Sequence, residues 1–241
     1  MYISSMNSNS QLGVSVDCVV FGYNGDSIKV LLIQQKTQDG GPLTESELQM
    51  ALPGDLVQAE ETLSECAARV LLELTSIEGI FLKQYHSFGD PDRVRGEKDK
   101  KWLKTFREFP NKRIITVAYY ALVSLHEYYP EASSFAGSIQ WVDVDKVPGL
   151  AFDHNEIFRY AVTTLREHIE PHHIGFELLP KKFTLSQLQH LHELVLDKKL
   201  DKRNFRKNVK RMDHVVPLDE KQIGVLHKPA QLFTFNPEAV N

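Results

Sequence analysis

The chain has 241 residues, 42% of them hydrophobic and 25% charged, which is ordinary for a globular protein and long enough for two domains. The net charge is −4, but the charges are unevenly distributed. Residues 181–241 carry 12 Lys and Arg against 7 Asp and Glu, whereas residues 1–180 carry 16 against 25. This split suggests a basic module that binds a polyanion, joined to an acidic module with another role. No apolar run reaches the roughly 18 residues that cross a bilayer, and the polar stretch 1–13 has no signal-peptide core, so we expect a cytoplasmic protein with a flexible tail over 1–13.

Residues 14–170 alternate strand patterns with helix patterns. The expected strands are 15–23, 27–35, 52–57, 80–88, 112–125 and 139–144, and the expected helices are 62–75 and 153–170. Asn24 and Gly25 between the first two strands are a strong hairpin signal. Cys18 and Cys66 fall in a strand and a helix, which favours buried thiols over a disulfide.

A charged insertion, 89–111, separates two of these strands. Within it the stretch 100–109 predicts a short helix that buries its apolar side chains, namely Trp102, Leu103, Phe106 and Phe109.

The pattern changes after a predicted linker at 171–183. Thr184 and Gln187 fit a capping box that starts a helix over 185–196. Asp201 fits the N-cap of a second helix, which we expect to reach Met212. The short strand-like runs that follow are 215–218, 223–226 and 231–235. This order within 184–241 is typical of a winged helix-turn-helix domain.

The stretch 54–77, GDLVQAEETLSECAARVLLELTSI, is the most informative part of the chain. It matches the Nudix box pattern G-x5-E-x7-R-E-U-x-E-E-x-G-U, in which U is a bulky aliphatic residue, at only part of its positions. The matching residues are Glu61, Arg69, Leu71, Glu73 and Ile77. The departures are Asp55 and Ser76 in place of glycines, and Val70 and Leu74 in place of glutamates.

The missing glutamates decide the predicted chemistry. A Nudix hydrolase gathers hard divalent cations around a diphosphate with several carboxylates on one helix face. Val70 and Leu74 offer no lone pairs, so Glu73 is the one carboxylate left on that face. We therefore expect a domain that resembles a Nudix hydrolase but is not an enzyme, has no catalytic or metal-binding residues and requires no cofactor.

The second helix of the C-terminal module suits nucleic acid. A recognition helix packs its apolar side on its own domain and brings Arg, Lys and Asn to phosphates and base edges. Arg203, Asn204 and Arg206 are candidates for base contacts. The candidate DNA-binding residues are Thr184, Ser186, Gln187, Lys202, Arg203, Asn204, Arg206, Lys207, Lys210, Arg211 and Lys228.

A degenerate Nudix domain followed by a winged helix resembles the Nudix-related transcriptional regulators, over about residues 14–235. Its most specific pieces, besides the box, are RIITVAYYAL at 113–122, GFELLPKKFTLSQLQ at 175–189 and DKRNFRKNVKRM at 201–212. The best-known class, NrtR, represses genes of NAD metabolism and responds to ADP-ribose, and the sister class AraR responds to arabinose. The resemblance implies an α/β/α sandwich, a homodimer and a palindromic double-stranded operator.

An ADP-ribose pocket needs cations or amides near the diphosphate and an apolar platform for adenine. The candidate ligand-binding residues from the matching elements are Gln34, Gln35, Lys36, Arg69, Glu73, Phe88, Asp90, Arg93 and Arg113. Three of these residues also have purely structural alternatives to ligand binding. Arg69 could form a salt bridge with Glu73, Phe88 could be a core residue, and Arg93 could be a solvated loop charge.

Two other functions stay open from the sequence. An active pyrophosphatase acting on ADP-ribose or a similar nucleoside diphosphate would need metal ligands from outside the box positions, such as Asp55, Glu60 and Glu61. A sugar-responsive regulator of the arabinose type would keep the same architecture with another effector.

Overall fold

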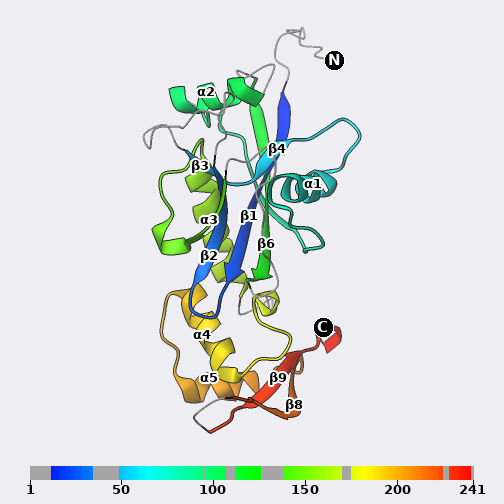
Figure 1. Ribbon diagram of the computed structural model, residues 1–241, viewed down its shortest axis with the longest axis vertical. Coiled ribbons are helices and arrows are strands. Elements are labelled where there is room, and N and C mark those ends of the chain that lie inside the picture. The colour runs from blue at the N-terminus through cyan, green and yellow to red at the C-terminus, as the bar shows by residue number, and fades with distance from the viewer. Residues whose placement is uncertain are drawn as a thin grey trace, which may run out of the picture. The chain divides into compact units, whose positions relative to one another are not determined.

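The computed structural model describes residues 12–34, 49–94, 96–106, 112–125, 138–169, 175–224 and 228–239. The chain divides into two compact units, one with most of a large sheet and one with the C-terminal helices and a small sheet (Figure 1). None of the described helices combines the length and the hydrophobicity that a bilayer-spanning segment requires.

A seven-stranded sheet forms the centre of the first unit. Its main path has the order β3-β2-β1-β6-β5, with β4 paired to β1 and β7 paired to β2. The strands are β1 (Gly13–Tyr23), β2 (Ile28–Gln34), β3 (Met50–Ala51), β4 (Gly54–Leu56), β5 (Lys83–Phe88), β6 (Ile114–Ser124) and β7 (Ser138–Asp143). The neighbours β1 and β6 are buried along almost their whole length, and the buried residues of β1 include the polar Ser15 and Asp17.

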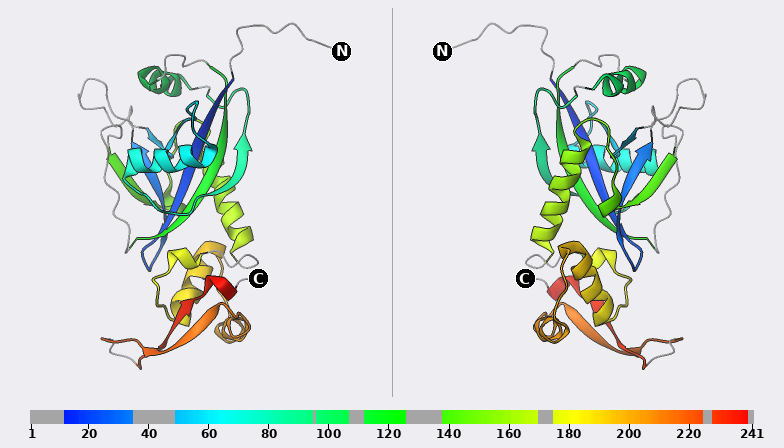
Figure 2. Two further views of the ribbon diagram at one scale, coloured as in Figure 1. Left: turned by 90° about the vertical axis from the view of Figure 1, so that its right-hand side faces the viewer. Right: turned by 90° about the vertical axis from the view of Figure 1, so that its left-hand side faces the viewer.

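Helices cover both faces of this sheet. Figure 2 shows α1 (Leu63–Thr75) on one face and α3 (His154–His168) on the other, so the predicted α/β/α sandwich is confirmed. The helix of the insertion, α2, spans Glu97–Phe106 and so begins before the predicted 100–109, while residues 107–111 lie outside the described part. The short 3-10 helix η1 (Val144–Lys146) follows β7.

Local signals set the turns and helix ends. The Asn24 side chain accepts the backbone N–H groups of Asp26 and Ser27 at 3.0 and 2.9 Å, and Gly25 takes a positive φ of 100°. The predicted hairpin is therefore confirmed. Thr62 caps α1 in a reciprocal capping box with Glu65. The thiols of Cys18 and Cys66 are free and buried, as predicted.

The second unit contains α4 (Leu185–Leu196), α5 (Lys202–Val209) and the antiparallel pair β8 (Val215–Lys221) and β9 (Gln231–Phe235). The 3-10 helices η2 (Phe176–Leu178) and η3 (Pro237–Ala239) flank them. The Phe176 and Phe235 rings stack at 4.3 Å, and Phe183 exchanges two backbone hydrogen bonds with Phe233. These contacts attach the 176–183 part of the predicted linker to β9, while 171–174 lie outside the described residues.

Two predicted elements of this unit differ from the structure. Helix α5 ends at Val209, three residues before the predicted end at Met212. The predicted strand at 223–226 is wrong for its described residues, because Ile223 is 97% exposed and Gly224 has a φ of 75°. The left-handed glycine and the exposed residue before it form a bend after β8 and not an extended strand.

Candidate functional site

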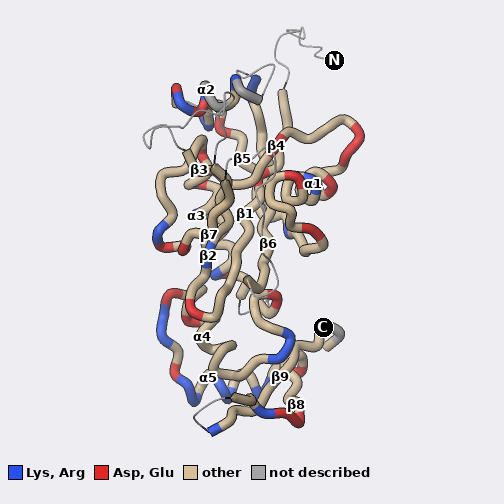
Figure 3. Tube along the Cα trace, in the orientation of Figure 1, with Lys and Arg blue, Asp and Glu red and all other residues tan. Residues whose placement is uncertain are grey.

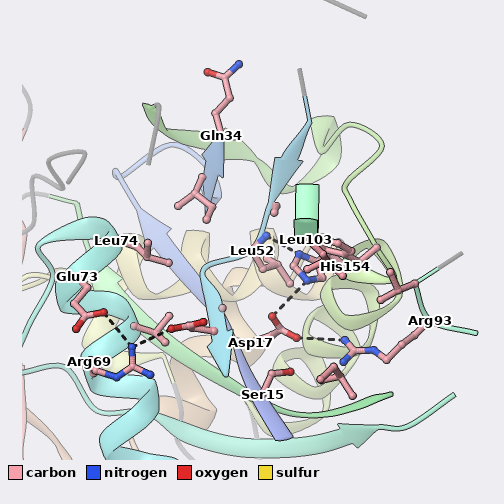
Figure 4. A pocket seen from close by; sticks show the side chains of 18 of the residues that line it. Ser15, Asp17, Gln34, Leu52, Arg69, Glu73, Leu74, Arg93, Leu103 and His154 are labelled. Atoms are coloured by element: carbon pink, nitrogen blue, oxygen red, sulfur yellow. Dashed lines mark hydrogen bonds and ion pairs between the residues drawn. The ribbon is translucent and has the colours of Figure 1, made fainter. Parts of the chain in front are cut away.

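A cavity of about 340 Å³ opens in the first unit between β1, β2, α1 and the segment after β5 (Figure 4). Its polar lining residues are Ser15, Asp17, Gln34, Asp55, Gln58, Arg69, Glu73, Arg93 and His154. Its other lining residues are Ile33, Ala51, Leu52, Gly54, Val70, Leu74, Val94, Leu103, Ile114 and Phe152. The volume of the cavity and its mixture of apolar and polar lining residues are typical of a small-molecule site.

Arg69 of α1 organises one end of this cavity. Its guanidinium bonds both oxygens of Glu61, with Nε–Oε2 at 2.9 Å and Nη2–Oε1 at 2.8 Å. The same group reaches Asp55 at 3.1 Å and Glu73 at 3.0 Å. The hydrogen bond from Arg69 lowers the pKa of Glu61 to about 2. The Arg69–Glu73 salt bridge, given above as the alternative to ligand binding, is thus present within a larger cluster of three carboxylates around one cation.

Arg93 organises the other end and is not a solvated loop charge. Its side chain is 7% exposed and forms a two-point ion pair with Asp153, Nε–Oδ2 at 2.8 Å and Nη2–Oδ1 at 2.7 Å. Its Nη2 also lies 3.3 Å from Asp17 Oδ2. Burial opposes the charge on Arg93, but the bonds to Asp153 hold its pKa above the ordinary value.

Asp17 and His154 complete this network. The backbone N–H of Leu52 donates to His154 Nδ1 at 2.9 Å, so the ring proton is on Nε2, which lies 3.4 Å from Asp17 Oδ1. Burial by itself would raise the pKa of Asp17, but His154 and Arg93 hold it below the ordinary value. Asp17 is therefore an anion inside the pocket.

Gly54 permits this position of the Asp17 carboxylate. Asp17 and Gly54 are opposite each other in the β1–β4 ladder. A Cβ atom at Gly54 would overlap Asp17 Oδ1 and would lie 2.9 Å from the Val16 carbonyl oxygen. The glycine is thus required by a close approach between two strands.

The structure brings together four of the predicted ligand-binding residues, Gln34, Arg69, Glu73 and Arg93. Phe88, Asp90 and Arg113 are not among the residues that line the cavity, and Gln35 and Lys36 lie outside the described part of the chain.

Each of the three residues away from the cavity has another environment. Phe88 is 7% exposed and packs edge-on against the rings of His86 and Tyr160. Asp90 accepts the backbone N–H of Asp92 at 2.7 Å, and exposed Arg113 donates to the Gly89 carbonyl at 3.3 Å.

The sequence interpretation missed Asp17, Asp153, His154, Phe152 and Leu103. The one available signal was Asp17, a charged residue in the middle of an apolar strand, since a buried charge needs a partner. Nothing local in the sequence indicates that His154 or Leu103 faces the same cavity.

A basic surface lies on the second unit. Asp201 caps α5 by accepting the Asn204 N–H at 2.8 Å, and Phe205 and Val209 are buried. The candidate DNA-binding side chains on α5 and just after it are exposed: Lys202, Arg203, Asn204, Arg206, Lys207, Lys210 and Arg211. Figure 3 shows Lys and Arg gathered along this helix.

The start of α4 and the β8–β9 wing add fewer candidates. Thr184 is 3% exposed, and its hydroxyl accepts the Gln187 N–H at 3.2 Å, so it caps α4 from a buried position. Ser186, Gln187 and Lys228 are exposed.

Both units of the chain match families of known proteins. Residues 11–162 match the NUDIX domain family, and residues 175–235 match the NrtR DNA-binding winged helix domain. A relative from Acinetobacter baylyi, the ADPR responsive transcriptional repressor NtrR, is 29% identical over 226 residues, which cover 92% of this chain and 81% of the relative.

Solved structures show the same two-part fold. Shewanella oneidensis NrtR is 25% identical with a TM-score of 0.71, covering 95% of this chain and 96% of NrtR. Its complex with a 27mer DNA gives 24% identity and a TM-score of 0.70, covering 94% and 95%. The NUDIX domain of that protein in complex with ADP ribose gives 23% identity and a TM-score of 0.52, covering 68% and 94%.

Proposed function

Because the chain belongs to the Nudix domain family and continues into an NrtR-type winged helix domain, we propose that it is an ADP-ribose-responsive transcriptional repressor of NAD metabolism genes. The observation that carries this proposal is the combination, in one chain, of an exposed basic helix with a Nudix cavity whose carboxylates are paired with arginine. We propose further that it acts in the cytoplasm as a homodimer, which would set two winged helices on a palindromic operator.

The Nudix fold implies a divalent metal cluster, and the residues on α1 do not fit one. Val70 and Leu74 line the cavity with methyl groups where metal ligands would stand. In the part of the chain that the structure describes, no group of three or more His, Cys, Asp or Glu side chains could hold a metal ion. This donor set supports binding of the effector without hydrolysis.

The pyrophosphatase alternative has less support from the geometry. It needs Asp55 and Glu61 as metal ligands, but both carboxylates are hydrogen-bonded to Arg69. A divalent cation would have to displace the guanidinium from both of them before it could bind.

The effector is carried over from the relatives, one named as ADPR responsive and one solved with ADP ribose. In this chain five carboxylates, those of Asp17, Asp55, Glu61, Glu73 and Asp153, surround the guanidiniums of Arg69 and Arg93. A diphosphate must therefore compete with carboxylates for these cations. The same carboxylate excess suits sugar hydroxyls, which donate hydrogen bonds, and it keeps the arabinose-type effector as the second candidate.

Calorimetric titration of ADP-ribose and of L-arabinose, each with Mg²⁺, tests the effector. A saturable isotherm for ADP-ribose that returns to baseline supports a sensor, whereas continued heat from ADP-ribose indicates turnover. Saturation by arabinose alone favours the second candidate.

A footprint on the promoters of NAD metabolism genes tests the DNA function. Arg203→Ala is expected to weaken operator binding by about 5–150-fold, the equivalent of about 1–3 kcal/mol for a lost base contact. The control is Lys104→Ala, an exposed lysine on α2 in the other unit, which should leave operator affinity unchanged. Absence of any specific footprint by the wild-type protein contradicts the repressor function.

A further inference from the structure

The insertion after β5 forms one side of the cavity. Arg93, Val94 and Leu103 of this segment line it, and Leu103 is 6% exposed although it belongs to a short, mostly charged helix. Among the described side chains of α2, Asp99 and Leu103 are buried whereas Lys98 and Lys104 are exposed, so the helix packs through the face that carries Asp99 and Leu103.

Asp99 fixes the position of α2. This side chain is 9% exposed, and its Oδ1 accepts the backbone N–H of Phe152 at 3.0 Å and the Gln49 amide at 3.4 Å. Its Oδ2 accepts the Gly96 N–H at 3.2 Å. Leu103 lies four positions after Asp99, so the two side chains share one helix face, which is directed at Phe152.

Phe152 is held in an unusual conformation beside this face. Its φ is 57°, which is uncommon for a bulky residue and persists where the surroundings impose it. Its ring centroid lies 5.1 Å from that of His154, whose Nδ1 accepts the Leu52 N–H. Leu52, Leu103 and Phe152 therefore line one corner of the cavity around the His154 imidazole.

This corner differs chemically from the Arg69 end of the pocket. Figure 4 shows Leu52, Leu103 and His154 together on one side, next to Asp17 and Arg93, and it shows Arg69 and Glu73 on the opposite side. Aliphatic and aromatic side chains next to a ring with a fixed tautomer suit a flat heteroaromatic ring, whereas the charged groups suit phosphate or sugar.

We propose that α2 is the base-binding wall of the effector pocket, in which Leu103 and Phe152 hold the purine of a nucleotide and set the space available to it. The proposal rests on the proposed ADP-ribose response and adds the orientation of the ligand. The cavity of about 340 Å³ is at the lower end of ordinary ligand sites, roughly 300–1,000 Å³, so a change of one side chain in this wall alters the fit.

The test uses the full chain and calorimetric titration with ADP-ribose and with 1,N6-etheno-ADP-ribose, whose base carries an extra fused ring. Leu103→Trp fills the corner and is expected to weaken ADP-ribose binding at least tenfold. Leu103→Ala enlarges it and is expected to improve the affinity for the etheno analogue relative to ADP-ribose at least fivefold. Lys104→Trp adds the same bulk at an exposed position of the same helix and should change both affinities less than twofold.

The outcomes separate this inference from the proposed function. Binding of ADP-ribose by the wild type with no effect of Leu103→Trp, or with no change of ligand preference in Leu103→Ala, overturns the base-binding wall alone. Failure of the wild type to bind ADP-ribose removes the proposed effector and this inference with it. Operator binding without ligand, equal to that of the wild type, shows that each variant is folded.

Discussion

Replacement of Arg93 tests the buried charge network most directly. The side chains of Arg93, Asp17 and Asp153 are 7%, 8% and 10% exposed. Arg93→Leu retains aliphatic packing at this position but leaves the carboxylates of Asp17 and Asp153 without their guanidinium partner. Removal of one partner of a buried ion pair costs about 3–5 kcal/mol, so we expect the free energy of unfolding of the first unit to fall by about that amount at pH 7. With a urea dependence of about 1–3 kcal/mol per molar, the unfolding midpoint drops by at least about 1 M.

Tryptophan fluorescence during urea denaturation measures this loss. Trp102 and Trp141, the two tryptophans of the chain, both belong to the first unit, so their emission reports on its unfolding. Arg159→Leu is the matched control, because Arg159 is an exposed arginine of α3 that donates to the Asn155 carbonyl. A surface change of this kind is expected to alter stability by no more than about 0.5 kcal/mol.

The pH dependence distinguishes lost charge pairing from lost packing. In the wild type the lowered pKa of Asp17 contributes stability above its ordinary value of 3.8, and this contribution is lost as the pH falls through the folded-state pKa. Without Arg93 burial favours the protonated carboxyl, so the deficit of Arg93→Leu should shrink as the pH falls from 7 toward 4. A deficit that is equal at both pH values, or no larger than that of Arg159→Leu, refutes the reasoning.

Three further predictions follow from the packing. Gly54→Ala should displace the Asp17 carboxylate and weaken effector binding at least tenfold in calorimetry; unchanged binding would contradict the close approach. Burial lowers the pKa of His192 to about 4, so the unfolded state binds the proton more readily and the second unit loses up to about 3 kcal/mol as the pH falls from 6.5 to 4. An NMR titration of this imidazole with a midpoint above pH 6 would disprove that. Burial raises the pKa of Cys66 to about 12 and that of Cys18 well above its ordinary value, so neither thiol should react with a disulfide reagent at pH 8 until the protein unfolds; rapid reaction of the native protein is the contrary result.

Features that depend on neighbours in the chain could be predicted from the sequence. The turn at Asn24 and Gly25 and the capping box of Thr184 with Gln187 involve residues within three positions of one another. The Arg69–Glu73 bridge follows from the spacing of four on a helix. The end of α5 was predicted at Met212 but lies at Val209. The three residues after Val209 continue the helical pattern, so the sequence does not show where the helix ends.

The degenerate box and the basic face of α5 were determined by the sequence alone, because a missing carboxylate and an excess of Lys and Arg are properties of composition at given positions. The tertiary structure alone decided which charges far apart in the sequence meet. Arg93 is 76 residues from Asp17 and 60 from Asp153, and His154 is 102 residues from the Leu52 N–H that fixes its tautomer. No periodicity in the chain encodes such separations. The sheet brings these residues into one buried site, and a charge buried there is stable only beside its partner.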